Sequence, residues 1–221
     1  MTVAAAEAAK AEVERAARAG GAAVVGVAAV AGEVPVPFGD YPRAVVAAIP
    51  LARGVLATCQ TEPTRLYAHH YRVVNAALDN VGCRIAAALE SRGYEALAVP
   101  ASQVVDWENT RGAVSHIRLA QAAGLGFVGR HGLLVAPRFG AGVRLTSVFT
   151  TAELAPAEPV VGDCGSCERC RPACPAQAVG AEAAEWDREA CLAVLRDFKK
   201  RITNQHICGV CVRVCAEAAR R

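Results

Sequence analysis

The stretch CGSCERCRPACPAQAV, Cys164–Val179, places four cysteines within eleven residues and follows the last of them with a proline. Four further cysteines stand beyond it, at Cys191, Cys208, Cys211 and Cys215. Thiolates are the ligands that zinc, copper and iron–sulfur clusters prefer, so this part of the chain indicates metal or redox chemistry. The spacing of the cysteines decides between these uses.

The first four cysteines have the spacing C-x2-C-x2-C-x3-C-P, which is the run of bacterial two-cluster ferredoxins. There, three cysteines bind one 4Fe–4S cluster and the fourth binds its neighbour. Two clusters require eight thiolates, and these two groups together supply eight. We therefore expect one cluster on Cys164, Cys167, Cys170 and Cys215, and the other on Cys174, Cys191, Cys208 and Cys211.

Structural zinc and disulfides are the alternative uses of these cysteines. Zinc sites bring cysteines together as separated C-x2-C pairs, four per ion, and have no need of the C-P step. A zinc-stabilised module that binds nucleic acid is thus the least favoured of the hypotheses that we keep. Metal analysis separates it from the iron–sulfur hypothesis.

The opening segment, MTVAAAEAAKAEVERAARAGG, carries charges where a signal peptide needs an apolar region. The next apolar run, AAVVGVAAVAG, is too short to span a bilayer. We therefore expect a cytoplasmic protein without a membrane partner, and that location favours reduced cysteines over disulfides.

The charge balance gives little support for a nucleic-acid partner. The formal net charge of +3 treats cysteines as neutral. Two clusters with their thiolates, each at roughly −2, would bring the total to about −1. The only basic run, KKR at Lys199–Arg201, is typical of a solvated helix face.

The first two thirds of the 221-residue chain alternate between helix and strand patterns. Helices are expected at 2–19 and 113–123, and strands at 22–30, 44–51, 94–102, 133–137 and 143–151. A long helix follows Thr61-Glu62-Pro63, with one apolar stripe of Tyr67, Tyr71, Val74, Leu78, Val81, Ile85 and Leu89. Cys59 and Cys83, outside the cysteine-rich part, are expected to be buried small hydrophobes.

The character of the chain changes near residue 155, after a polar connection that contains prolines. We expect an α/β cofactor or substrate domain at 1–155 and a ferredoxin-like domain with two 4Fe–4S clusters at 156–221.

Within the expected first domain, the segment AGLGFVGRHG contains Gly124, Gly126 and Gly129. A helix precedes this segment and a strand follows, so it is not a Rossmann turn. Close approach to a ligand and a simple tight turn both remain open.

Three segments together resemble the epoxyqueuosine reductase family. SHIRLAQAAGLGFVGRHGLLVAPRFGAGVRLTSVFTTAEL is similar to a glycine-rich segment of these enzymes, and CGSCERCRPACPAQAV and CGVCVRVC are similar to their two cluster motifs. The similarity runs from about Ala44 to Cys215 and marks the chain as a short relative. The cluster motifs are shared with many ferredoxins, whereas their combination with A-G-L-G-x-x-G is more specific.

The resemblance implies a nitroreductase-like α/β (α+β) domain that binds cobalamin, followed by the ferredoxin-like module, an arrangement also related to reductive dehalogenases. It implies that electrons pass through two 4Fe–4S clusters to cobalamin, which removes a group from an electrophilic substrate. It places the expected cofactor contacts at Ser115, His116, Gly124, Gly126, Gly129 and Arg130.

The chain departs from the family at several positions. In HHYRVVN, His70 stands where the family has a proton-donating aspartate, so we expect His70 to be the catalytic proton donor. Arg130 and His131 replace a Lys-Asn pair. No helical-repeat domain follows Arg221, which leaves tRNA a doubtful partner.

We expect a donor of the ferredoxin or flavodoxin type and an acceptor that is a small molecule or a corrinoid protein. The alternative function is an electron carrier or reductive activator that serves a separate corrinoid or redox protein.

Overall fold

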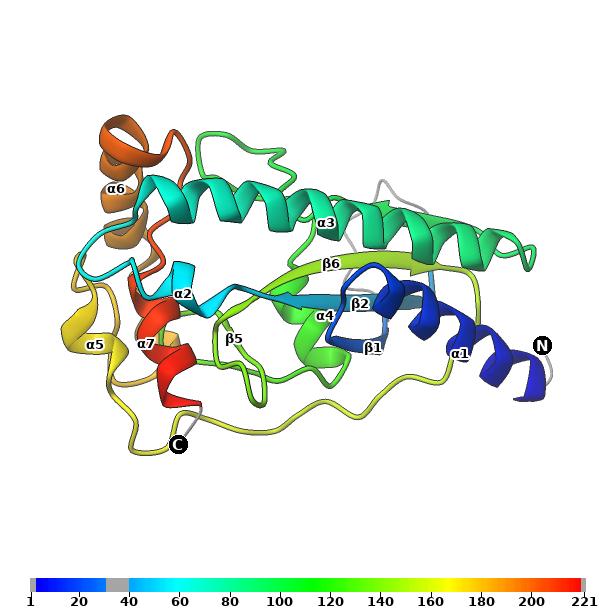
Figure 1. Ribbon diagram of the computed structural model, residues 1–221. Coiled ribbons are helices and arrows are strands. Elements are labelled where there is room, and N and C mark those ends of the chain that lie inside the picture. The colour runs from blue at the N-terminus through cyan, green and yellow to red at the C-terminus, as the bar shows by residue number, and fades with distance from the viewer. Residues whose placement is uncertain (1–2, 31–39, 220–221) are drawn as a thin grey trace. The chain divides into compact units, whose positions relative to one another are not determined.

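The computed structural model describes residues 3–30 and 40–219 (Figure 1). Residues 31–39, between the strands expected at 22–30 and 44–51, lie outside the described residues. The chain divides into two compact units that are discontinuous in sequence: residues up to 49, 75–125 and 144–160 form the first, and residues 50–74, 126–143 and 161 onward form the second. The expected domains at 1–155 and 156–221 stay a proposal.

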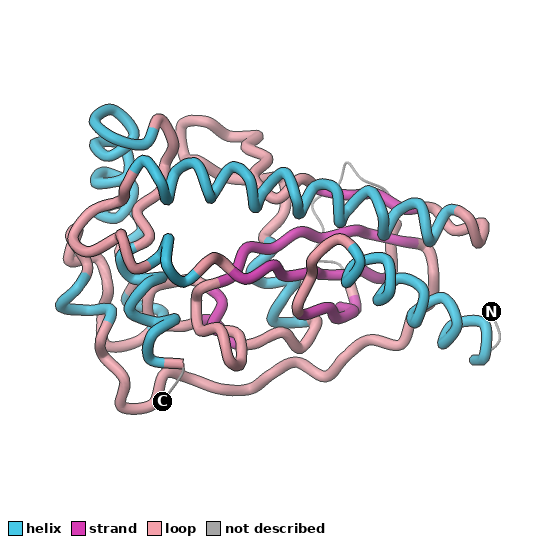
Figure 2. Tube along the Cα trace, viewed as in Figure 1, coloured by secondary structure: helices cyan, strands magenta, loops and turns pink. Residues whose placement is uncertain are grey.

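The first unit is a mixed α/β structure around a four-stranded sheet. It contains α1 (Val3–Ala19), β1 (Val24–Ala29), β2 (Arg43–Pro50), most of α3 (Arg65–Glu90), β3 (Ala96–Val99), α4 (His116–Ala122) and β6 (Val143–Thr150). The strand order is β1-β2-β6-β3, and Figure 2 shows the strands side by side beneath α3. Strands β1 and β2 are antiparallel, with Val27 opposite Val45, and β3 is antiparallel to β6.

One face of this sheet is buried against α1 and α3. Alternate residues of a strand point to the same face, and Val27, Val45 and Val148 supply that face from three strands. They join a core with Ala9, Val13, Ala17, Ala22, Ala47, Val81, Ile85, Leu89, Ala152 and Leu154. Burying each Val, Leu or Ile side chain of this core contributes roughly 1.5–3 kcal/mol.

The opposite face of β1 lies close to the end of α4. A Cβ atom on Gly26 would stand 2.1 Å from the carbonyl oxygen of Ala123 and 2.6 Å from Cδ1 of Leu125. Only glycine leaves room for this approach. The single glycine of β1 therefore lets the segment after α4 pack directly on the strand.

Helix α3 begins at Arg65, and Thr64 precedes it with a hydroxyl that accepts a hydrogen bond from the Tyr67 N–H at 3.1 Å. The expected apolar stripe is buried along its whole length except at Tyr71, which is half-buried.

The expectation for Cys59 is confirmed, since its side chain is buried. The expectation for Cys83 is wrong: it is exposed, because it lies two residues from Val81 and therefore on the far side of the helix.

The second unit holds the cysteine-rich residues together with two earlier segments. It contains α2 (Arg53–Leu56), β4 (Phe127–Val128), β5 (Leu134–Val135), α5 (Cys170–Ala173), η1 (Ala183–Glu185), α6 (Arg188–Phe198), η2 (Lys199–Thr203) and α7 (Val210–Ala218). Strands β4 and β5 form an antiparallel pair inside the glycine-rich segment. The sequence predicts no strand at β4 and no helix at α2.

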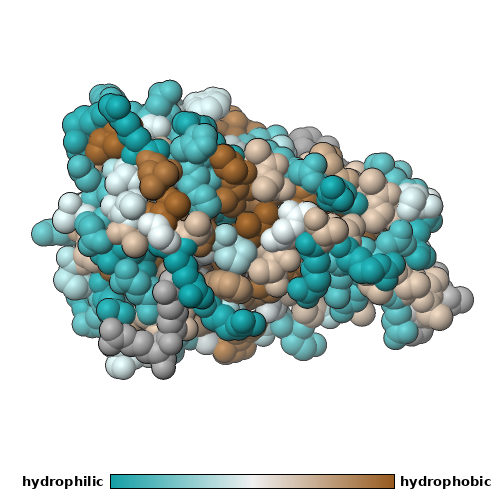
Figure 3. Space-filling model, viewed as in Figure 1, coloured by the Kyte–Doolittle hydropathy of each residue, from teal (hydrophilic) through white to brown (hydrophobic). Residues whose placement is uncertain are grey.

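The basic run Lys199–Arg201 lies at the start of η2, where Lys200 and Arg201 are exposed as expected. Arg201 pairs with Asp197 at 2.8 Å and with Glu62 at 3.5 Å. Figure 3 shows teal hydrophilic residues over much of this face, mixed with tan and brown hydrophobic ones. In the described part of the chain, no helix is both long and apolar enough to cross a membrane.

Candidate metal centre

Several cysteines of the second unit raise one another's pKa. Burial and then the charges of Cys164, Cys170 and Cys167 raise the pKa of the Cys215 thiol to about 11. Burial and then Cys191, Cys174 and Cys59 raise the pKa of the Cys208 thiol to about 12. Cys170, from the first predicted set, also raises the pKa of Cys211, which is assigned to the second. The assignment of each cysteine to a cluster stays a prediction.

Cys174 follows Cys170 by only four residues, yet the spacing assigns it to the other cluster. Its charge raises the pKa of Cys191, Cys208 and Cys211, after the larger effect of burial on each. It is not among the groups that raise the pKa of Cys215. The short helix α5 begins at Cys170 of the first set and ends at Ala173, directly before Cys174 of the second set.

Apolar side chains surround the region where the two sets meet. Cys170, Val179 and Val214 form a buried cluster, with Ala173, Cys174, Trp186 and Cys211 packed against it. Thiolates crowded in such surroundings are unfavourable unless a cation or cluster lies among them. The donor set and its apolar shell therefore fit iron–sulfur clusters.

Backbone N–H groups donate hydrogen bonds to sulfurs of both sets. The Ala141 N–H donates to Sγ of Cys215 at 3.3 Å, and the Ala178 N–H donates to Sγ of Cys174 at 3.4 Å. Hydrogen bonds to ligand sulfurs are one of the levers by which proteins tune cluster potentials. The first of them depends on Gly140, whose φ is +56° and whose Cβ would lie 2.5 Å from the carbonyl oxygen of Cys215.

Within the described residues, no three His, Cys, Asp or Glu side chains converge closely enough to hold one metal ion. A four-iron cluster lies between its thiolates and holds them apart, so its ligands need not converge on a single point.

His70 lies half-buried on α3, and its Nε2 atom accepts a hydrogen bond from the Ala52 N–H at 2.9 Å. Burial, and then the charge of His69, lowers the pKa of His70. An Nε2 atom that accepts a hydrogen bond carries no proton, so the ring is neutral with its proton on Nδ1. This bond connects His70 to the backbone just before α2.

The expected cofactor residues in the first unit are engaged by the chain itself. Ser115 caps α4 by accepting a hydrogen bond from the Arg118 N–H at 3.3 Å. His116 has partners on both nitrogens, the Ser147 hydroxyl at 2.8 Å and the Pro100 carbonyl at 3.2 Å, and burial lowers its pKa to about 4. A Cβ on Gly124 would stand 2.8 Å from the carbonyl oxygen of Glu158.

The expected cofactor residues in the second unit are likewise engaged. A Cβ on Gly126 would lie 2.2 Å from the carbonyl oxygen of Val135, so β5 occupies that space. A Cβ on Gly129 would lie 2.7 Å from Cγ2 of Val135 and 3.3 Å from Sγ of Cys164. The guanidinium of Arg130 binds three backbone carbonyls. All six residues are thus in contact with other parts of the chain, and their role in binding cobalamin stays a prediction.

Sequence reasoning assigned no role to two residues of this unit, His131 and Arg213. His131 is buried, its pKa is lowered to about 4 by burial, and its Nδ1 accepts the Leu133 N–H at 3.2 Å. Arg213 donates to the carbonyl of Cys59 at 2.9 Å and pairs with Glu217 at 3.1 Å. The replacement of Lys-Asn by Arg130-His131 was the available signal for His131, whereas nothing in the sequence indicated Arg213.

The chain shares its fold with two groups of solved reductases. A reductive dehalogenase structure, reported to suggest a mechanism for B12-dependent dehalogenation, has a TM-score of 0.74 at 21% identity, covering 92% of this chain and 30% of that one. An epoxyqueuosine reductase structure with an epoxyqueuosine-modified tRNA-Tyr stem loop has a TM-score of 0.61 at 19% identity, covering 95% of this chain and 65% of that one.

Curated relatives carry the same two names. The epoxyqueuosine reductase of Synechococcus sp. (strain RCC307) is 40% identical over 74 residues, which is 34% of this chain and 23% of the relative. The tetrachloroethene reductive dehalogenase of Desulfitobacterium hafniense is 44% identical over 70 residues, 30% of this chain and 13% of the relative. No protein-family model matches the chain. The chain is thus similar to reductases of both kinds, and its matches span a minor part of each curated relative.

Proposed function

We propose that this protein is an iron–sulfur oxidoreductase whose eight cysteines hold two 4Fe–4S clusters and pass electrons through them to an acceptor. The proposal is supported by the spacing of the cysteines, by the neighbours that raise the pKa of Cys208 and Cys215, and by the apolar cluster that includes Cys170, Cys174 and Cys211. Cys164, Cys167, Cys170 and Cys215 would hold one cluster, and Cys174, Cys191, Cys208 and Cys211 the other. Two adjacent clusters can each accept one electron and pass it on.

The finer proposal names a cobalamin-type cofactor as the acceptor and reductive removal of a group from an electrophile as the reaction. It rests on similarity to epoxyqueuosine reductases and to a B12-dependent dehalogenase structure. No step through cobalamin is assigned to Ser115, His116, Gly124, Gly126, Gly129 or Arg130, because the chain itself occupies their contacts. Similarity to a structure solved with a tRNA stem loop makes tRNA a partner to include in the tests.

A second function is supported because the residues expected to contact the cofactor are in contact with the chain itself. The protein would be an electron carrier or reductive activator that serves a separate corrinoid or redox protein. It would receive electrons from a donor of the ferredoxin or flavodoxin type and would hold no corrinoid itself.

One titration separates the two functions. Protein purified without oxygen, with its clusters verified by absorbance, is titrated with cob(II)alamin and followed by electron paramagnetic resonance. Binding at about micromolar affinity, with a change in the cobalt signal, is expected of the cobalamin-dependent reductase. No binding to any corrinoid, with both clusters intact, would contradict it and favour the carrier. Turnover of a small electrophile by the isolated protein would argue against the carrier.

A further inference from the structure

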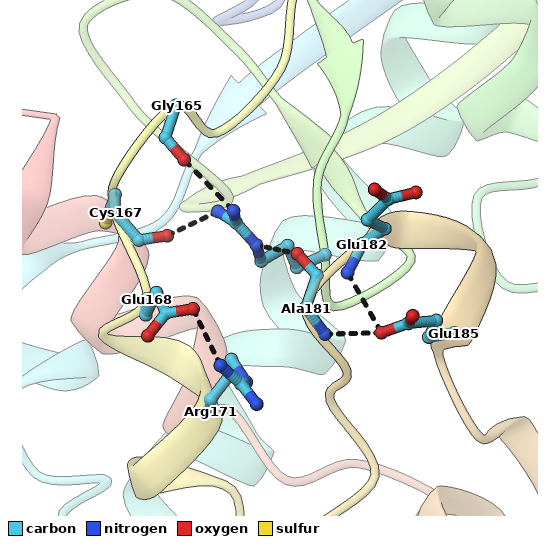
Figure 4. Close-up of polar contacts among 8 residues, drawn as sticks. Gly165, Cys167, Glu168, Arg171, Ala181, Glu182 and Glu185 are labelled. Carbon is cyan, nitrogen blue, oxygen red and sulfur yellow. Dashed lines mark hydrogen bonds and ion pairs between the residues drawn. The ribbon is translucent and has the colours of Figure 1, made fainter.

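Arg130 holds the loop that carries the first cysteines. Its guanidinium donates to the carbonyl oxygen of Cys167 at 2.7 Å, to that of Gly165 at 3.0 Å, and to that of Ala181. Figure 4 draws these bonds to Gly165, Cys167 and Ala181. A planar guanidinium presents several N–H groups in a fixed fork, so one side chain can fix the directions of three carbonyl groups at once.

Two of these carbonyls belong to the turn between Cys164 and Cys167. The Cys167 N–H donates to the carbonyl oxygen of Cys164 at 3.0 Å, which closes the turn. Gly165 has a φ of +51°, a left-handed conformation, and its N–H donates to Asp163 at 2.6 Å. The third carbonyl, of Ala181, lies just before η1, where the Glu185 side chain accepts the Ala181 N–H at 2.7 Å (Figure 4).

The charge of Arg130 has no carboxylate partner in the described part of the chain, where its bonds go to carbonyls. Arg171, on α5, differs: it pairs with Glu168 at 2.6 Å and its side chain is 39% exposed (Figure 4). The bond to the Cys167 carbonyl places the positive charge of Arg130 beside the turn that carries Cys164 and Cys167.

We propose that Arg130 is a positioning residue for the cluster held by Cys164, Cys167, Cys170 and Cys215, and that its unpaired charge raises the reduction potential of that cluster. The inference rests on the proposed function. A reduced cluster is more negative than an oxidised one, so a nearby positive charge favours the reduced state. The three hydrogen bonds to carbonyl oxygens fix the guanidinium beside the turn from Cys164 to Cys167. The same bonds stabilise the conformation of that turn.

The test compares Arg130→Gln, Arg130→Lys and the matched control Arg171→Gln in the full chain, reconstituted without oxygen. Redox titrations followed by electron paramagnetic resonance give the potential of each cluster. A second measurement follows the rate at which an iron chelator removes the clusters. Neither measurement depends on turnover.

In Arg130→Gln we expect one cluster potential to become more negative while the other stays unchanged. In Arg130→Lys the charge remains but the fork is lost, so the potentials should stay near the wild-type values. Both variants lose the guanidinium fork. For a net loss equal to one charge-assisted hydrogen bond, the chelator should remove that cluster roughly tenfold faster from both variants than from the wild type. Arg171→Gln should shift the potential less than Arg130→Gln, because the exposed charge of Arg171 is screened and paired.

Equal shifts of both clusters in Arg130→Gln, or equal shifts in Arg130→Gln and Arg171→Gln, would overturn the proposal. If Arg130→Gln fails to assemble its clusters, Arg130→Lys decides: an unchanged potential with faster chelation supports the proposal, and a lowered potential or unchanged chelation overturns it. A wild-type protein without 4Fe–4S clusters would instead refute the proposed function, which is a separate and recognisable result.

Discussion

The chemistry of His70 depends on which of its nitrogens is already occupied. The resemblance assigns this residue the role of proton donor, and the structure gives its Nε2 an N–H donor from Ala52. Protonating Nε2 would break that bond, in addition to the cost of charging a partly buried ring, so the ring is stabilised in its neutral form. Only the Nδ1 proton can be donated while the bond persists.

Replacing His70 separates its structural from its chemical contribution. His70→Ala removes the acceptor for the Ala52 N–H, and we expect the thermal midpoint to fall by about 2–4 °C, as for the loss of ~1 kcal/mol. His70→Gln places an oxygen near the position of Nε2 and should recover most of this loss. The control is His69→Ala, since His69 is exposed on the same helix and its loss should change little.

The same variants test the proton-donor assignment once a substrate is known. A donor acting through Nδ1 would lose turnover in both His70→Ala and His70→Gln, with cluster absorbance retained. Unchanged midpoints in both variants would contradict the structural contribution of the Ala52 bond.

At the scale of the element, α3 shows what a periodic pattern can and cannot predict. Its stripe was predicted residue by residue, because 3.6-residue periodicity depends only on which face meets the core. The same geometry places Cys83 on the exposed face, where composition alone suggested burial. Strand β5 lies within the strand expected at 133–137, whereas β4, of two residues, carries no pattern of its own and pairs with β5 where Gly126 approaches Val135.

The stripe of α3 provides a stability test. Ile85 is fully buried in the core of the first unit, and Ile85→Ala should lower the free energy of unfolding by about 2–5 kcal/mol through lost burial and a residual cavity. Val73, on the same helix, is 52% exposed, so Val73→Ala should change it by about 0.5 kcal/mol or less. Denaturant unfolding followed by circular dichroism measures both, and similar losses would contradict the packing of α3.

At the scale of the whole molecule, the sequence predicted the mixed α/β class. The change of composition near residue 155 indicates a single boundary, and the domains on either side of it stay a proposal. The compact units of the structure are discontinuous in sequence, and residues 50–74 and 126–143 belong to the unit that holds the eight clustered cysteines. Contacts such as Gly140 against Cys215 and Gly209 against Tyr67 depend on tertiary packing, which leaves no local signal in the sequence.

The interlocked assignment of the cysteines is the central claim, and iron content tests it most directly. After reconstitution without oxygen, the wild-type chain should hold about eight irons and eight acid-labile sulfides. Cys174→Ala combined with Cys211→Ala removes two ligands of one proposed cluster and should leave about four irons. Cys174→Ala combined with Cys170→Ala removes one ligand from each cluster and should leave almost none. The reverse pattern, with four irons kept only when Cys170 and Cys174 are replaced, would contradict the account, as would zinc without labile sulfide in the wild type.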